Sequence, residues 1–280
     1  MSRGTLFIVA TPIGNLRDVT IRALDTLRTC HLVVAEDTRR TRQLLSHFSI
    51  GGKKVQRLDA HAGPRDVERI VERLTGGDQV ALVTDAGTPA VSDPGEALVG
   101  AAIAAGVPVV PVPGASALLA ALVASGLTTP AGFRFVGFLP RDGGARRDAI
   151  ALVASTPEAT VLFESANRLR ATLRELADAT PERPACVARE LTKVHEELVR
   201  GTCIELAADD REWIGEVAIV LGAHAPQERA ERIDDRTLDA RIDEALGRGE
   251  HARSLAERLA AWSGRGKREV YVRVIERKKR

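Results

Sequence analysis

The chain has 280 residues, of which 44% are hydrophobic, and a formal net charge of +2. This length exceeds what one core usually fills, so two domains and an appendage are expected. The cysteines Cys30, Cys186 and Cys203 form no CxxC pair, which argues against a disulfide framework or a metal site and favours a reducing, cytoplasmic setting. Glycines and prolines interrupt the uncharged span 97–133, so a membrane helix is not expected there.

Short β-branched strands alternate with helical patterns in the first part of the chain. We expect strands at 6–10, 31–35, 80–84 and 107–112, and helices at 21–29, 38–48 and 64–77. Pro64 and the glycines at 76–77 are typical start and stop signals for the last of these helices. The alternation predicts βα units and a largely parallel sheet in an N-terminal domain spanning residues 1–114.

The next part, residues 115–224, has a different pattern. Several strands follow one another without a helix between them, at 133–139, 159–165, 185–192, 195–202 and 213–222. Helices are expected near 145–155 and 166–179. The sequence therefore predicts a second α/β domain with a mixed sheet.

The last part, residues 225–280, begins as a linker and continues as short helices with glycine-containing turns. This pattern is typical of a small helix-turn-helix module. Residues 265–280 carry a charge of +6, so the rest of the chain carries −4. A basic tail favours a polyanionic partner; the alternative is a solvated helix end.

Three loops follow predicted strands, at 9–15, 84–95 and 111–117, and none contains lysine or arginine. Neither a P-loop nor a GxGxxG pattern occurs, which argues against a nucleotide triphosphate or a dinucleotide. A cationic ligand such as S-adenosylmethionine suits uncharged turns with the carboxylate of Asp85 beside them. Alternatively, Asp85 is a cap or turn residue and the glycines are ordinary turn glycines.

Several strings carry a resemblance to a known family. They are IVATPIGNLRDVTIRAL, VVAEDTRRTRQLL, LVTDAGTPAVSDPG, VPGASALLAALVASGL, FVGFLPR, LFESANRL, VARELTKVHEELVRGT and ARSLAERLAAWSGRGKREVYVRVIE. In this order, and over nearly the whole chain, they resemble the ribosomal RNA small-subunit methyltransferase I family. That family belongs to the tetrapyrrole-methylase superfamily.

The resemblance implies two α/β domains with S-adenosylmethionine in the cleft between them, in a homodimer. It implies methylation of the ribose 2′-hydroxyl of a cytidine in the decoding region of 16S rRNA. Cofactor contacts are expected in the three loops and in the second domain, at Pro12, Gly14, Asp85, Gly87, Thr88, Pro89, Ser116, Ala117, Phe163, Glu164 and Leu191. Two departures stand out: Ala166-Asn167 replaces the family's usual Pro-His, and only His61 remains of a His-and-Asn pattern after the third strand.

Transfer of a methyl group to a ribose hydroxyl needs close positioning and a group that accepts the proton. We predict Asp37 as the proton acceptor, with Lys193 as its orienting or deprotonating partner. Glu164 and His195 are further candidates. The alternative for Asp37 is an N-cap of the following helix or an ion pair with a neighbouring arginine.

RNA binding needs cations along the rim of the cleft. Candidate residues lie after the second strand, around a glycine-rich turn and in the tail: Arg39, Arg40, Arg42, Arg141, Arg146, Arg147, Arg168, Arg265, Lys267 and Arg268. Aromatic residues make up only 3% of the chain, so recognition should depend on phosphates and shape more than on base stacking.

Two other functions remain open at this stage. The same fold serves corrinoid and other tetrapyrrole methyltransferases, although the basic tail and the arginine clusters favour RNA. The altered FESANR segment also allows a non-catalytic RNA-binding factor that responds to S-adenosylmethionine.

Overall fold

A computed structural model describes residues 3–224, 234–263 and 266–278, except the side chain of Ala261. The chain divides into two compact units, one of residues 1–154 and 158–223, the other of 155–157 and 224–280. The first unit contains two sheets, and the second contains three helices. Domain boundaries at residues 114 and 224 stay predictions.

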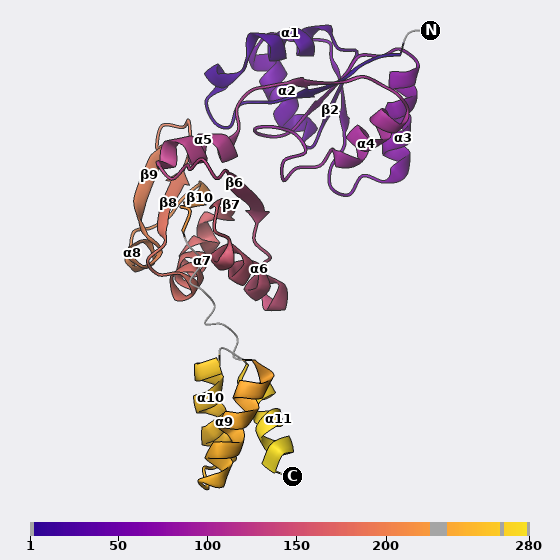
Figure 1. Cartoon of the computed structure of the whole chain (residues 1–280). Coiled ribbons are helices and arrows are strands. Elements are labelled where there is room, and N and C mark those ends of the chain that lie inside the picture. The colour runs from indigo at the N-terminus through magenta and orange to yellow at the C-terminus, as the bar shows by residue number, and fades with distance from the viewer. Residues whose placement is uncertain (1–2, 225–233, 264–265, 279–280) are drawn as a thin grey trace. The chain divides into compact units, whose positions relative to one another are not determined.

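The first sheet is fully parallel, as the βα alternation predicted (Figure 1). Its strands lie in the order β3-β2-β4-β1-β5, with β1 at Leu6–Val9, β2 at Leu32–Ala35, β3 at Lys54–Arg57, β4 at Val80–Val83 and β5 at Val109–Val112. Strand β3 was not expected from the sequence. It is an edge strand that pairs only with β2, and its polar composition gives no apolar run.

Helices cover both faces of this sheet, because successive side chains of each strand point to opposite faces. Leu32 and Val34 of β2 pack against α3 (Pro64–Thr75) and α4 (Glu96–Ala104). Val33 and Ala35 pack on the other face, against α1 (Ile21–Thr29) and α2 (Thr38–His47). Figure 1 shows these two helix pairs on opposite sides of β2. A short 3₁₀ helix, Leu16–Asp18, follows the first loop.

The second sheet is mixed, which confirms the predicted fold class. Its order is β6-β7-β10-β8-β9; only β6 and β7 run parallel. The strands are β6 (Phe133–Phe138), β7 (Ala159–Ser165), β8 (Pro184–Arg189), β9 (Glu197–Thr202) and β10 (Glu216–Leu221). Strand β8 ends earlier than predicted, since Glu190 and Thr192 adopt φ angles of +49° and +67°. Such angles do not continue a strand.

The second sheet is also covered on both faces. Helix α5 (Ala117–Ser125) packs on one face, while α6 (Gly143–Ser155), α7 (Ala166–Ala179) and α8 (Cys203–Ala208) pack on the other. Because α5 is a single short helix, it covers part of its face only. The remainder of that face forms a wall of the cleft described below.

The second unit is a small helical module. Helices α9 (Asp235–Gly247), α10 (Ala252–Ser263) and α11 (Lys267–Lys278) share an apolar core. Arg273 and Arg277 of α11 pair with acidic residues of α9 at 2.5–3.1 Å, for example Arg273 with Asp239 at 2.5 Å. These pairs neutralise Arg273 and Arg277 of the basic tail inside the module. No helix of the described residues is long and apolar enough to cross a membrane.

Candidate active site

The three loops predicted to hold a ligand lie together at the carboxyl edge of the first sheet. Thr11 and Gly87 form an isolated β-bridge, with N–H to carbonyl distances of 2.8 and 3.0 Å. The Thr11 hydroxyl donates to the Thr84 carbonyl at 3.1 Å, and the Thr88 hydroxyl donates to the Ala115 carbonyl at 3.3 Å. These bonds hold the backbone of all three loops in one arrangement. Gly87 has φ +84°, a conformation that disfavours other residues.

A cleft of about 400 Å³, here the inter-sheet cleft, opens between these loops and the second sheet. Its first wall is the stretch from Asp85 to Asp93 together with Ile13. The N-terminus of α5 borders it, where the Ser116 hydroxyl caps the helix by accepting from the N–H of Leu119. Ligands of open α/β sheets bind at such carboxyl edges.

The second wall is the uncovered part of the second sheet. Phe163 of β7, Ala218 of β10 and Ala188 of β8 stand opposite one another in one cross-strand row. All three line the inter-sheet cleft. The two small alanines leave space in front of the sheet, while the rings of Phe163 and Phe138, with centroids 5.7 Å apart and planes tilted by 58°, form an apolar edge. The space in front of the alanines suits a planar ligand.

Two neighbouring segments of the cleft have strained backbone. Ala90 and Ser92 have φ angles of +64° and +63°, and Glu190 and Thr192 have +49° and +67°. Each such residue costs about 1–3 kcal/mol, and strain of this kind concentrates at functional sites. The second segment also supports the first loop, because Thr192 accepts a hydrogen bond from the N–H of Asn15 at 3.0 Å.

Gly14 makes this contact possible. A Cβ atom at this position would stand 2.5 Å from Cγ of Lys193, so a larger residue would push the two segments apart. The Lys193 ammonium lies between the carboxylates of Glu190 and Glu216, at 3.0 Å from each. Although burial alone would lower the pKa of Lys193, these two carboxylates raise it overall. Lys193 is therefore held as a cation.

The carboxylates near the cleft differ in how they are paired. Asp85 is 3.4 Å from Arg40 and accepts from the N–H of Asp37 at 3.1 Å. Asp93 has no ion pair with any residue that the structure describes. Burial raises the pKa of Asp93; the Thr84 hydroxyl lowers it in part, and the neighbouring Asp85 raises it again. Burial likewise raises the pKa of Glu36, next to Thr84. The cleft thus has unbalanced negative charge at Asp93.

Glu164 lines the cleft but is 2% exposed and fully engaged. Its carboxylate accepts from the Thr172 hydroxyl at 2.7 Å and lies 3.3 Å from Arg168 and 3.9 Å from Arg146. Arg146, 6% exposed, also binds Glu175 at 2.9 Å. This network anchors the start of α7, at Ala166 and Asn167.

The residues predicted to contact a cofactor fall into two groups. Those lining the inter-sheet cleft are Asp85, Gly87, Thr88, Ser116, Ala117, Phe163, Glu164 and Leu191. Three others do not line it: Pro12 borders a second cavity, Gly14 supports the Lys193 segment, and Pro89 is buried within the loop. The sequence analysis did not single out Asp93, Phe138, Ala188 or Ala218. Of these, Asp93 was detectable, since it is a second acid in the same loop as Asp85.

The predicted catalytic residues lie beside the cleft and not in its wall. Asp37 is the N-cap of α2, and its carboxylate accepts from the N–H groups of Arg39 and Arg40 at 2.7 and 3.4 Å. The hydrogen bond from Arg39 lowers the pKa of Asp37. His195 and His61 are both exposed. The roles of Asp37 and Lys193 stay predictions.

The candidate RNA-binding residues also separate by environment. Arg39, Arg42, Arg141, Arg147 and Arg268 are exposed. Arg146 and Arg168 serve the Glu164 network, the latter also donating to the carbonyls of Leu139 and Pro140 at 2.8 and 3.0 Å. Lys267 pairs with Glu257 of α10. Arg265 lies outside the described residues.

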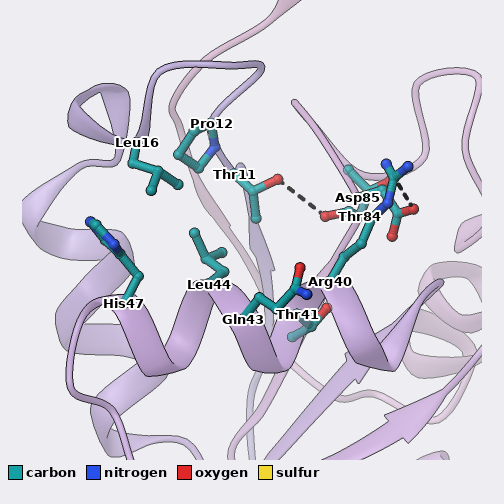
Figure 2. A pocket seen from close by; sticks show the side chains of 10 residues that line it. All are labelled: Thr11, Pro12, Leu16, Arg40, Thr41, Gln43, Leu44, His47, Thr84 and Asp85. Carbon is teal, nitrogen blue, oxygen red and sulfur yellow. Dashed lines mark hydrogen bonds and ion pairs between the residues drawn. The ribbon is translucent and has the colours of Figure 1, made fainter.

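A second cavity of about 370 Å³, here the α2 pocket, lies beside the first loop (Figure 2). Arg40 and Asp85 line both cavities. Among the described residues, no group of three or more His, Cys, Asp or Glu side chains could hold a metal ion. All three cysteines are buried, and burial raises the pKa of Cys203 to about 11, so its thiol stays protonated.

Comparisons with known proteins agree with this geometry. The sequence profile of the family described as Tetrapyrrole (Corrin/Porphyrin) Methylases matches residues 5–207. The chain belongs to the tetrapyrrole methylase family. It is therefore a methyltransferase by family, and its two sheets are those of a tetrapyrrole methylase.

Curated relatives of this methylase share the name ribosomal RNA small subunit methyltransferase I. The protein of Xylella fastidiosa strain Temecula1 is 46% identical over 91% of this chain and 94% of its own. That of Micromonospora olivasterospora is 42% identical over 97% of this chain and 86% of its own. These relatives confirm the resemblance stated from the sequence.

Solved structures confirm the fold. Uroporphyrin-III C-methyltransferase of Thermus thermophilus, in complex with S-adenyl homocysteine, has a TM-score of 0.57 and 22% identity, covering 78% of this methylase and 97% of its own chain. A diphthine synthase has a TM-score of 0.59 and 18% identity, covering 79% and 92%.

Proposed function

We propose that this protein transfers a methyl group from S-adenosylmethionine to the ribose 2′-hydroxyl of a cytidine in the decoding region of 16S rRNA. The observation that carries the proposal is the extent of similarity. The ribosomal RNA methyltransferases match 91–97% of this chain at 42–46% identity, whereas the tetrapyrrole and diphthine enzymes cover 78–79% of it at 18–22% identity.

The inter-sheet cleft fits S-adenosylmethionine by its chemistry. Burial disfavours the ionised form of the Asp93 carboxylate and raises its pKa. A cationic ligand beside Asp93 would stabilise that ionised form. The backbone N–H groups at the N-terminus of α5, next to Ser116 and Ala117, suit a carboxylate group. The row of Phe163, Ala218 and Ala188 suits a flat ring. One ligand that carries all three features is S-adenosylmethionine.

The residues of the chain then position the two reactants and accept the proton of the ribose hydroxyl. When bound, S-adenosylmethionine supplies a methyl group on a cationic sulfur. The bonded loops hold the cleft preformed, which reduces the entropy cost of bringing a hydroxyl to attack distance. Asp37 is the proposed proton acceptor, and Lys193, held as a cation by Glu190 and Glu216, is its proposed orienting partner.

The proposed RNA surface uses the exposed cations near the cleft. Arg39 and Arg42 extend from α2, Arg141 lies just before α6, and Arg147 lies in the first part of that helix. Exposed arginines of this kind neutralise phosphates. Arg146 and Arg168 are left out of this surface because their guanidinium groups are used by Glu164. A homodimer and a cytoplasmic setting remain part of the proposal.

One assay tests the proposal. The full-length protein is incubated with labelled S-adenosylmethionine and with small ribosomal subunits that lack the modification, or with a tetrapyrrole precursor. We expect label in 16S rRNA and an alkali-resistant phosphodiester bond next to one cytidine. Label in the macrocycle would instead support a tetrapyrrole methyltransferase. Binding of the donor without transfer to either substrate would support a non-catalytic factor.

A further inference from the structure

The α2 pocket is lined by one face of a helix and by the first and second loops (Figure 2). Arg40, Gln43, Leu44 and His47 recur at helical spacing, so they share one face of α2. Thr41 and Leu45 of the same helix are buried. Helix α2 thus attaches to the sheet by one face and presents a second, mixed face to this pocket.

The opposite side of the pocket is formed by Thr11 and Pro12 of the first loop, by Leu16 of the 3₁₀ helix after it, and by Thr84 and Asp85 of the second loop. In Figure 2, Arg40 and Asp85 lie at one end of the pocket, and His47 and Leu16 lie at the other. The first end adjoins the inter-sheet cleft, because Arg40 and Asp85 line both cavities. A molecule in the α2 pocket would therefore have one end next to the methyl donor.

We propose that the α2 pocket holds the target nucleoside, with the ribose at the Asp85 end and the base at the His47 end. This inference rests on the proposed function and specifies its substrate site. The cavity of about 370 Å³ falls in the range of small-molecule sites, which is roughly 300–1,000 Å³. An enzyme that modifies a nucleotide of folded RNA commonly turns it out of its stack into such a pocket.

The side chains of the pocket match the chemistry of an unstacked base. A base needs flat or apolar contact on its faces and hydrogen bonds on its edge. Leu16, Leu44 and the imidazole of His47 offer the first, with the His47 ring held edge-on to Phe48 at a centroid distance of 4.8 Å. The amide of Gln43 offers both a donor and an acceptor. No residue that the structure describes hydrogen-bonds the Gln43 side chain, so its amide is available.

The charge of its lining residues also distinguishes the α2 pocket from the inter-sheet cleft. Arg40 is the cation shared by the two cavities, and its partner Asp85 balances it. The α2 pocket contains no carboxylate besides Asp85, whereas the inter-sheet cleft contains Asp93, Glu164 and Glu216 as well. An uncharged base beside a nearby phosphate fits the α2 pocket, and a cationic donor fits the cleft.

The test compares variants of α2 in the full-length protein, with unmodified small ribosomal subunits as substrate. Gln43→Ala and His47→Ala should each raise the KM for subunits by about fivefold or more, as expected for lost base contacts. Their affinity for S-adenosylmethionine should stay unchanged. His47→Phe keeps a flat ring and should stay within about twofold of the wild type. Ser46→Ala is the matched control, since Ser46 lies on α2, like Gln43 and His47, but does not line the α2 pocket.

A second readout does not depend on turnover. A 16S rRNA fragment with 5-iodocytidine at the methylated position is irradiated with the protein, and crosslinked peptides are mapped. We expect crosslinks within residues 40–47 or at Leu16. Wild-type kinetics in both alanine variants, or crosslinks confined to other helices, would overturn the inference and leave the proposed function intact. Failure of the wild type to methylate any RNA would overturn the proposed function itself.

Discussion

The two sheets of the first unit contribute to the cleft in different ways. The parallel sheet contributes the loops that follow its strands, so its contacts come from backbone groups and short side chains such as Gly87 and Thr88. The mixed sheet contributes its own face, through Phe163, Ala188 and Ala218 in the middle of its strands. In the proposed donor site, one region would contact the ligand with the ends of its strands, and the other with the part of its face that α5 leaves open.

This difference predicts that substitutions in the two regions affect ligand binding and catalysis differently. The loops are joined by specific hydrogen bonds and contain strained backbone, so we expect them to carry the polar and catalytic functions. An apolar sheet face should instead determine shape, so that added volume blocks binding while loss of one ring weakens it modestly. Substitutions in each region therefore test whether the loops and the sheet face have these separate roles.

The largest effect is expected at Asp37, on the side of the parallel sheet. Asp37→Asn should retain affinity for S-adenosylmethionine but lose most turnover, by about 10²- to 10⁴-fold, if the carboxylate accepts the ribose proton. Asparagine is as good an N-cap as aspartate, so helix α2 should keep its stability. The measurement is single-turnover methylation of small subunits together with thermal unfolding. Asp25→Asn, at an exposed carboxylate on α1, serves as the control.

The pH profile identifies the acceptor independently. An unperturbed aspartate has a pKa of ~3.9. The hydrogen bond from the N–H of Arg39 lowers the pKa of Asp37, so this carboxylate stays ionised at pH values below that usual range. If Asp37 is the acceptor, the rate should fall only at pH values below that range. Burial raises the pKa values of Asp93 and Glu36, so an acid limb above the range would point to one of these two carboxylates in place of Asp37. An unchanged rate in Asp37→Asn would also remove Asp37 from this role.

The next effect is expected from the mixed sheet. Ala218→Leu adds volume at the centre of the open face and should weaken binding of S-adenosylmethionine by about 10- to 100-fold, as overpacking of a filled site does. Val220→Leu is a matched control on the same strand and face, at a residue that packs with α5 instead of lining the cleft. Equal loss of binding in both variants would attribute the effect to destabilised folding and would contradict the proposed wall.

These two regions were not equally predictable from the sequence. Strands β1, β4 and β5 of the parallel sheet appear as short apolar runs, and each is followed by a loop whose glycines and lack of lysine and arginine were visible in the sequence. The open face of the mixed sheet was not visible, because Ala188 and Ala218 look like any core residues until the strand register sets them side by side. The environment of Arg146 was hidden for the same reason. Its partner Glu175 lies far along the chain, so an arginine beside a glycine turn gave no sign of burial.

A smaller effect is expected at Asp93, again on the loop side. Asp93→Asn should weaken binding of S-adenosylmethionine by about tenfold and binding of S-adenosylhomocysteine much less, because only the former has a cationic sulfur. Since the pKa of free Asp93 is raised, the affinity of the wild type for S-adenosylmethionine should rise with pH through that pKa, and Asp93→Asn should lose this dependence. Calorimetry at several pH values measures both, with Asp59→Asn, which pairs with Arg57, as the control. Equal losses for the two ligands would show that Asp93 does not face the sulfonium.

The smallest effect is expected at Phe138, at the edge of the mixed sheet. Its ring is 58% exposed and lies 5.7 Å from that of Phe163, so its removal takes away one side of the apolar edge without opening the core. A contact between the Phe138 ring and a flat ring of the donor would contribute about 0.5–1.5 kcal/mol, so Phe138→Ala should weaken the affinity for the donor by about two- to tenfold. Phe133→Ala removes the other exposed phenylalanine of β6, which does not line the cleft, and should leave the affinity unchanged. A larger loss in Phe138→Ala than in Asp93→Asn would reverse the comparison, because the sheet face would then contribute more to binding than the charged loop.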